Sequence, residues 1–155
     1  MHARVKVAAL ALGATLSLTG CSLAANITTS NNYDASDGVG LDVAEISAKN
    51  LLLVTDAANA PAVLVGTLYN TGTDATTVTI NVAGTVDDVV VPAHGSVTLG
   101  VGEGEHEFVT TSPVAPGALT TVSLQPASVA AVSEPLPVLD GTLAEYQAVL
   151  DALAG

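Results

Sequence analysis

The sequence predicts an all-β domain, an antiparallel sandwich that ends in a short C-terminal helix. From Leu41 onward, short runs rich in Val and Thr are separated by turn-forming residues, and β-branched residues favour pleated, half-buried strands. Turn residues recur about every 8 to 12 positions, the spacing typical of a sandwich. Near the C-terminus the pattern changes, because apolar residues there follow a helical period.

Two segments, 62–70 and 75–82, give the clearest strand patterns. The first, AVLVGTLYN, is too short and too β-branched for a helix and ends in the turn sequence NTGTD. In the second, Val or Ile at every second position alternates with Thr or Asn, which predicts one buried and one solvated face. Further strands are expected at residues 42–54, 87–91, 96–100, 106–109 and 120–125.

The C-terminal segment combines an extended stretch, a turn and a helix. Pro137 suits an edge or extended segment, and residues 140–141 (Asp-Gly) suit a turn. Residues 142–153 have the three-and-four spacing of a helix, with Thr142 as the expected N-cap and Glu145 as its capping-box partner. A frayed tail is the alternative. The apolar positions of this segment are Leu143, Tyr146, Val149 or Leu150, and Leu153.

The predicted core is aliphatic, because the chain has no Trp, one Phe and three Tyr while 49% of its residues are hydrophobic. Each Val, Leu or Ile contributes about 1.5–3 kcal/mol on full burial, so stability is expected to come from many small terms. A domain over residues 41–155 is long enough to bury roughly two thirds of its unfolded surface around one core without disulfides.

The N-terminus has the layout of a bacterial lipoprotein precursor. A short basic segment precedes an apolar run of about a dozen residues, which is too short for the roughly 20 that span a bilayer. The sequence Leu-Thr-Gly-Cys at 18–21 resembles a lipobox, which makes residues 1–20 a signal peptide and Cys21 the lipidation site. The alternative is a secretory signal with a chance cysteine. We expect a lipid-anchored protein on the outer face of the cytoplasmic membrane.

Residues 21–40 are rich in small polar residues and are expected to form a flexible tether of roughly 25 Å. Once the signal is removed, Lys49 is the one Lys or Arg against 15 acidic residues, a formal charge of about −14. Such a surface excludes nucleic acid as a partner and is repelled by anionic headgroups. It is either a halophile-like surface or an acidic face that docks a basic partner.

The segment GEGEHEF, residues 102–108, is the main candidate for chemistry. In an extended chain, Glu103, Glu105 and Glu107 would share one side and His106 the other. Together with His94 they could bind calcium, zinc or copper. Their spacing is not diagnostic, and a solvated edge strand explains the charges more simply. We therefore predict no metal or cofactor site, with metal binding by these residues as the alternative.

Enzyme signatures are absent from the sequence. It has no G-x-S-x-G elbow, no H-E-x-x-H helix, no phosphate-binding glycine loop and no C-x-x-C pair. A Glu103 and Glu107 acid–base pair has no supporting pocket signal, and His94 lies in VPAHGS, a turn sequence. A hydrolase would need an apolar pocket with perturbed carboxylates. We expect a protein that is not an enzyme and has no catalytic residues.

The lipobox and the segments YDASDGV, VAEISAKNLLLV, AVLVGTLYN, VVVPAHGSVTLG and LPVLDGTLAEYQAVL together resemble the small actinobacterial lipoproteins of the LpqE type. This resemblance implies an immunoglobulin-like or cupredoxin-like sandwich. It also implies a non-enzymatic accessory module, with the cytochrome bcc-aa3 respiratory supercomplex as the implied partner in the membrane. The same sandwich resembles periplasmic copper chaperones, whose sites depend on Met and His. The chain departs from them, since its one Met is Met1, within the predicted signal.

Overall fold

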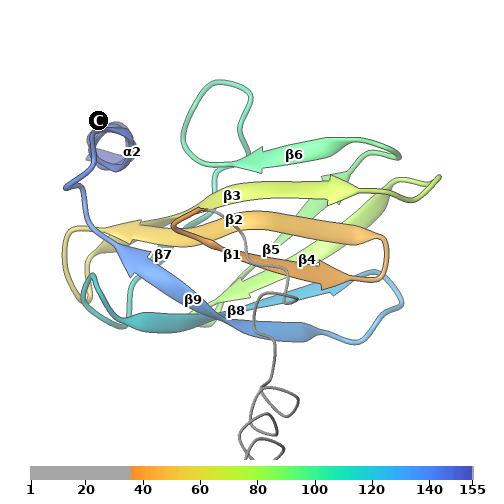
Figure 1. Ribbon diagram of the computed structural model, residues 1–155, viewed down its shortest axis with the longest axis horizontal. Coiled ribbons are helices and arrows are strands. Elements are labelled where there is room, and N and C mark those ends of the chain that lie inside the picture. Colours follow the sequence, from red (N-terminus) through yellow and green to blue (C-terminus); the bar gives the residue numbers. More distant parts are fainter. Residues whose placement is uncertain (1–35, 155) are drawn as a thin grey trace, which may run out of the picture. The chain divides into compact units, whose positions relative to one another are not determined.

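The computed structural model describes residues 36–154, so the predicted signal peptide, the lipidation site Cys21 and most of the predicted tether lie outside the described residues. The described residues form nine strands and one helix (Figure 1). These elements are β1 (Val39–Val43), β2 (Ile46–Thr55), β3 (Pro61–Asn70), β4 (Thr76–Val82), β5 (Thr85–Val91), β6 (Ser96–Leu99), β7 (Val109–Thr111), β8 (Leu119–Pro126), β9 (Val132–Leu139) and α2 (Ala144–Ala154).

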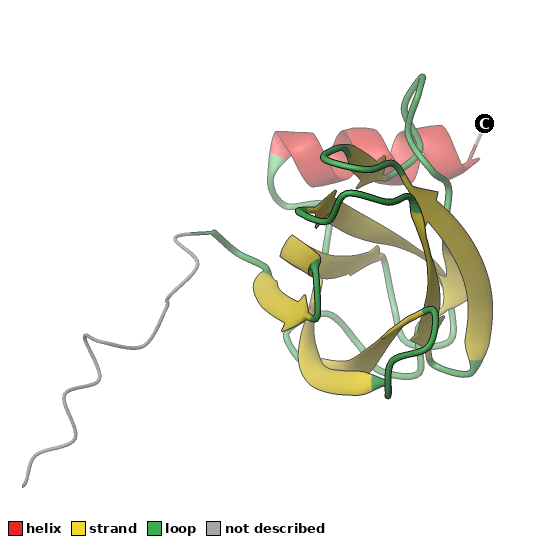
Figure 2. Cartoon of the chain, turned by 90° about the vertical axis from the view of Figure 1, so that its right-hand side faces the viewer, coloured by secondary structure: helices red, strands yellow, loops and turns green. Residues whose placement is uncertain are grey.

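The strands form two layers joined at one corner by β9. Layer A contains β1, β2, β3, β6 and β7, and layer B contains β5, β4, β8 and β9. Strand β9 runs antiparallel to β8 and then pairs in parallel with β2 through Val138 and Leu139. The path β5-β4-β8-β9-β2-β3-β6 thus curls into a nearly closed barrel (Figure 2). The predicted all-β sandwich with a C-terminal helix is confirmed, with one parallel pair among antiparallel ones.

The core between the layers is aliphatic, as predicted. Alternation along β4 buries Val78, Ile80 and Val82 and leaves the intervening Thr and Asn side chains outside. Phe108 is the one aromatic residue in the central cluster of described side chains. The interior therefore depends on close packing of branched aliphatic side chains.

A β-bulge at Asn50 reverses the orientation of β2 side chains. The register with β3 shifts between Lys49 and Leu52, and Asn50 has a left-handed φ of 53°. Its Oδ1 accepts a hydrogen bond from the Gly38 amide at 3.0 Å. Before the bulge, the even-numbered residues of β2 point into the core. Because the bulge adds one residue, the odd-numbered Leu51 points into the core after it, and Leu52 points outward.

Helix α2 covers the outward apolar residues that follow the bulge. Tyr146 and Leu150 of α2 pack against Leu52 and Val54 of β2 in a second, smaller core. The Tyr146 hydroxyl also donates a hydrogen bond of 2.9 Å to Asp37, just before β1. The C-terminal helix is thereby fastened to β2 and to the segment that precedes β1.

Two strand predictions are corrected by the pairing pattern, and the extended segment expected at Pro137 is confirmed. Segment 42–54 is two strands, because the chain turns at Ala44, which has a positive φ of 52°. The strand expected at 106–109 lies at 109–111, where it pairs with the start of β3. The extended segment around Pro137 belongs to β9, a full strand. Proline is accommodated there because the Val138 amide donates to Ala118 next to β8, so the alternate positions Pro135 and Pro137 present their backbone nitrogens away from β8 and no β8 hydrogen bond is lost.

The helix start also differs from the prediction. The helix begins at Ala144, and the Leu143 carbonyl accepts hydrogen bonds from the amides of Tyr146 and Gln147, so Leu143 occupies the N-cap position. The Thr142 amide donates to the Asp140 carboxylate at 2.9 Å instead. The side chain and amide of Thr142 hold the pKa of Asp140 below its usual range. None of the described helices is long and apolar enough to cross a membrane.

Candidate functional site

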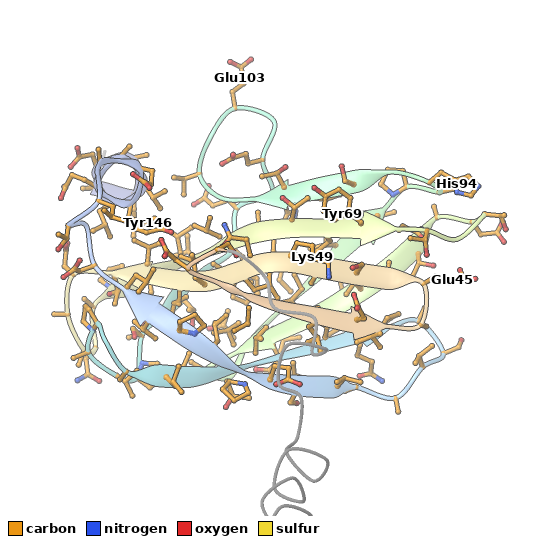
Figure 3. The ribbon with its side chains drawn as sticks, viewed as in Figure 1. Glu45, Lys49, Tyr69, His94, Glu103 and Tyr146 are labelled. Atoms are coloured by element: carbon orange, nitrogen blue, oxygen red, sulfur yellow. The ribbon has the colours of Figure 1, made fainter. Side chains whose placement is uncertain are left out.

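The acidic segment 102–107 is a turn rather than an extended strand. Glu105 folds back so that its carboxylate accepts the Gly102 amide at 2.7 Å. The same carboxylate lies directly over Gly100, so a side chain at position 100 would displace Glu105 from this position. Glu103 lies at the tip of this loop (Figure 3). The three glutamates therefore do not share one strand face, and that prediction is wrong because the close approach of Glu105 to the glycines favours a turn.

His106 joins the two layers instead of facing a ligand site. Its Nε2 lies 2.8 Å from Asp87 Oδ2, which connects the loop before β7 to strand β5. The hydrogen bond from His106, aided by the Asp88 amide, holds the pKa of Asp87 below its usual range. The hydroxyls of Thr85 on β5 and Thr110 on β7 lie 2.7 Å apart, so they also join the two layers along this seam. The pairing of Asp87 with His106 could not be predicted from the sequence, because the two residues are 19 positions apart.

His94 lies in the turn between β5 and β6, as its surrounding sequence predicted, with a positive φ of 48°. Its amide donates to the Gly72 carbonyl at 3.1 Å. Figure 3 shows His94 and Glu103 at separate loops. Within residues 36–154, no three His, Cys, Asp or Glu side chains are grouped so that they could hold a metal ion. The alternative metal set of His94, His106 and the glutamates is therefore not assembled.

Three grooves on the domain are shallow, and each is lined by one acidic side chain and no histidine. One lies between α2 and Asp56, a second lies beside Glu45 and Pro126, and a third lies between α2 and Glu105. General acid–base catalysis by two carboxylates needs both on one substrate. None of these grooves offers that arrangement.

The outer face of layer B is broad and nearly uncharged. Thirteen side chains point outward from β5, β4, β8 and the part of β9 before Leu139, and Asp88 is the one charged residue among them. Val86, Val90 and Leu119 are exposed by 58%, 62% and 62%. The remaining outward residues are Thr77, Thr79, Asn81, Thr121, Ser123, Gln125, Ser133, Pro135 and Pro137. Exposed apolar side chains grouped on one face are typical of interaction surfaces.

Asp88 lies between Val86 and Val90 on the outward side of β5. The Thr79 hydroxyl donates to its carboxylate at 2.6 Å, so a neighbouring strand fixes the position of this charge. The result is a fixed negative charge flanked by two exposed apolar side chains.

The outer face of layer A has an exposed polar half before the Asn50 bulge. We call the outward residues of this half the Tyr69 platform; they are Asp42, Ser47, Lys49, Thr67, Tyr69, Ser96 and Thr98. Figure 3 shows Lys49 and Tyr69 on the same side of neighbouring strands. Lys49 Nζ lies 3.5 Å from Asp42. The Ser47 hydroxyl bond and the Lys49 charge hold the pKa of Asp42 below its usual range.

Comparisons with known proteins identify a fold. No family model matches the chain, and no curated protein matches it. Among solved structures, the apo PCuAC domain from PmoF1 superposes with a TM-score of 0.51 at 14% identity, over 64% of this chain and 98% of that domain. The copper-bound PCuAC domain from PmoF2 gives a TM-score of 0.49 at 14% identity, over 66% and 98%. The fold is thus a cupredoxin-like β-sandwich.

Proposed function

We propose that this protein is a lipid-anchored, extracytoplasmic binding module without catalytic activity, which docks a protein partner through the outer face of layer B. The observation that carries the proposal is the single charge, Asp88, on a four-strand face of an otherwise acidic domain. A face of exposed apolar and hydroxyl side chains is desolvated at lower cost than a charged one.

The partner that fits this face carries a basic side chain flanked by apolar ones. Such a group would pair with Asp88, which Thr79 already positions, while its neighbours cover Val86 and Val90. The net acidic charge of the domain would speed the encounter with a basic partner. Together with the lipobox resemblance, this favours a partner in the membrane, and the LpqE-type resemblance makes the cytochrome bcc-aa3 supercomplex the specific candidate.

The structural likeness to copper domains does not supply a second function. Copper(I) sites favour soft thioether ligands, and the one Met of the chain is Met1. Residues 36–154 also contain no grouped set of metal ligands. At 14% identity, the likeness supports a shared architecture.

Fractionation tests the anchoring part of the proposal. The wild-type chain should sediment with washed membranes, and Cys21→Ser should appear in the soluble fraction, because the acyl chains supply the membrane affinity. Persistence of Cys21→Ser in the membrane fraction would contradict lipid anchoring through this cysteine.

Photo-crosslinking in native membranes tests the docking face. A photoreactive amino acid at position 86 or 90 should give one discrete adduct, identified by mass spectrometry as a membrane protein and lost on Asp88→Lys. The same group at Thr98, on layer A, is the matched control and should give no such adduct. An adduct with a cytochrome subunit would support the accessory role in the supercomplex. An adduct with a different membrane protein would support docking through layer B but contradict the supercomplex as the partner. Equal labelling from position 98, or no adduct, would overturn the proposal.

A further inference from the structure

The Tyr69 platform is arranged by strand register in two rows. Asp42, Ser47, Tyr69 and Ser96 lie in one row across β1, β2, β3 and β6. In the adjacent row, Lys49, Thr67 and Thr98 lie across β2, β3 and β6. Strands are spaced about 4.8 Å apart, so four of them give a platform about 14 Å long, which suits a short oligosaccharide.

Tyr69 is the exposed aromatic residue of the described domain. Its side chain is 45% exposed, whereas Phe108 and Tyr146 are exposed by 1% and 8%. Tyr69 points outward from β3, a strand with neighbours on both sides, so residues from adjacent strands border the ring. A partly exposed ring on a flat sheet face presents a surface for stacking.

The residues around Tyr69 provide both kinds of hydrogen-bonding group. Lys49, the diagonal neighbour of Tyr69 across β2 and β3, is a donor, and the Asp42 carboxylate is an acceptor. The Ser47, Thr67, Ser96 and Thr98 hydroxyls act as either. Asp42 is positioned by the Ser47 hydroxyl and by Lys49, so part of this polar set is ordered before a ligand arrives.

The chemistry of the platform selects among ligand classes. Phosphates and acidic polymers are repelled by the many carboxylates of the chain. A peptide strand would need an open sheet edge, but the platform is built on a sheet face. A metal ion would find only the carboxylate of Asp42. A neutral sugar ring has an apolar C–H face for the tyrosine ring and hydroxyls that both donate and accept hydrogen bonds.

We propose that the Tyr69 platform binds neutral oligosaccharides, with one pyranose ring stacked on Tyr69 and its hydroxyls hydrogen-bonded to Lys49 and the flanking Ser and Thr residues. This site lies on layer A, so it does not depend on the protein docking proposed for layer B. The two activities could be carried by the same molecule.

An NMR titration tests the proposal with the purified protein and four neutral probes, maltohexaose, cellohexaose, mannohexaose and N-acetylchitohexaose. Binding of at least one should shift the amide signals of Ser47, Lys49, Thr67, Tyr69 and Thr98. Tyr69→Ala should weaken the affinity at least about 10-fold, a change of about 1.4 kcal/mol, while Tyr69→Phe keeps the ring and stays within about 3-fold. Val86→Ala, on layer B, should leave affinity unchanged.

Lys49→Met provides a second variant in case Tyr69→Ala is poorly folded. It keeps an unbranched side chain but removes the donor, and we expect about 3-fold to 10-fold weaker binding. If no probe shifts these amide signals at about 10 mM, the platform does not bind neutral sugars even with millimolar affinity, and the proposal is overturned. Shifts that map to another face, or affinity unaffected by both variants, would also overturn it. The photo-crosslink from position 86 should survive Tyr69→Ala, so the two proposals fail independently.

Discussion

The outer face of layer A is divided at the Asn50 bulge into a half that α2 covers and an exposed half. The outer face of layer B is uncovered except at Leu139, the last residue of β9, which packs against the cluster formed with α2. This difference in coverage follows from the polarity of the side chains that each layer places outward. After the bulge, layer A places Leu52 and Val54 outward, and these need a covering element. Layer B places mainly Thr, Ser, Asn and Gln outward, which water solvates well.

This comparison separates structural surfaces from surfaces open to a ligand. Tyr146 and Leu150 satisfy the apolar half of layer A within the chain. Among the exposed apolar and aromatic side chains, Val86, Val90, Leu119 and Tyr69 stand on faces that no element of the described chain covers. These faces are therefore the ones that we propose for binding.

The largest expected contrast is between Leu52→Ala beneath α2 and Val86→Ala on layer B. Leu52 is fully buried, so its truncation should lower the free energy of unfolding by about 2–5 kcal/mol. Val86 is 58% exposed, and its truncation should change stability by no more than about 0.5 kcal/mol. Urea denaturation of both variants measures the difference. Equal losses would mean that α2 does not cover layer A in solution.

A second contrast compares two asparagines. Buried Asn70 donates to the Asp74 and Val91 carbonyls at 2.8 and 3.2 Å and accepts the Gly72 amide at 2.8 Å. Asn70→Ala should lower the free energy of unfolding by about 1–3 kcal/mol, because the buried partners of Asn70 lose their hydrogen bonds. The matched control is Asn81→Ala on layer B, which removes one exposed bond to Gly84. Thermal unfolding should show the smaller loss for Asn81→Ala, and the reverse order would contradict the structure.

Tyr146→Phe tests how α2 is fastened. Loss of the hydroxyl bond to Asp37 should cost about 0.5–1.5 kcal/mol. Burial and the Asp37 carboxylate raise the pKa of Tyr146 to about 12. Because the folded pKa is raised, this contribution is fully present below about pH 10 and is lost as pH rises toward 12. In a spectrophotometric titration, Tyr146→Phe should remove the highest step. An unchanged titration curve would place the high pKa elsewhere.

The smallest effect is expected at the seam between the layers, where Asp87 meets His106. The folded pKa of Asp87 is lowered, so its stabilisation is fully present above about pH 4 and is lost as pH falls through the folded pKa. The pair is partly exposed, so Asp87→Asn should cost less than about 1 kcal/mol near neutral pH. Urea denaturation from pH 3 to 7 measures it. In a His106→Ala background, Asp87→Asn should lower the free energy of unfolding by less than it does in the wild-type chain. An equal loss in both backgrounds would show that Asp87 and His106 are not coupled.

Much of the candidate site chemistry was visible in the sequence only as residue types. The turn at His94 was predicted because Pro, Gly and Ser surround it, and these are local preferences. The acidic segment was predicted as a strand, but Glu105 finds a local partner in the Gly102 amide, and that contact favours a turn. The proximity of Tyr69 and Lys49 could not be predicted, because it depends on the pairing of β2 with β3.

The sequence by itself determined the all-β class, the alternation along β4, the aliphatic core and the C-terminal helix. These follow from the order of neighbouring residues, since side chains alternate along a strand and repeat every three or four positions on a helix. The tertiary structure alone decided the bulge at Asn50, the parallel pairing of β9 with β2, and the Asp87–His106 contact. Those features depend on register between segments distant in the chain, which is fixed only when the whole core packs.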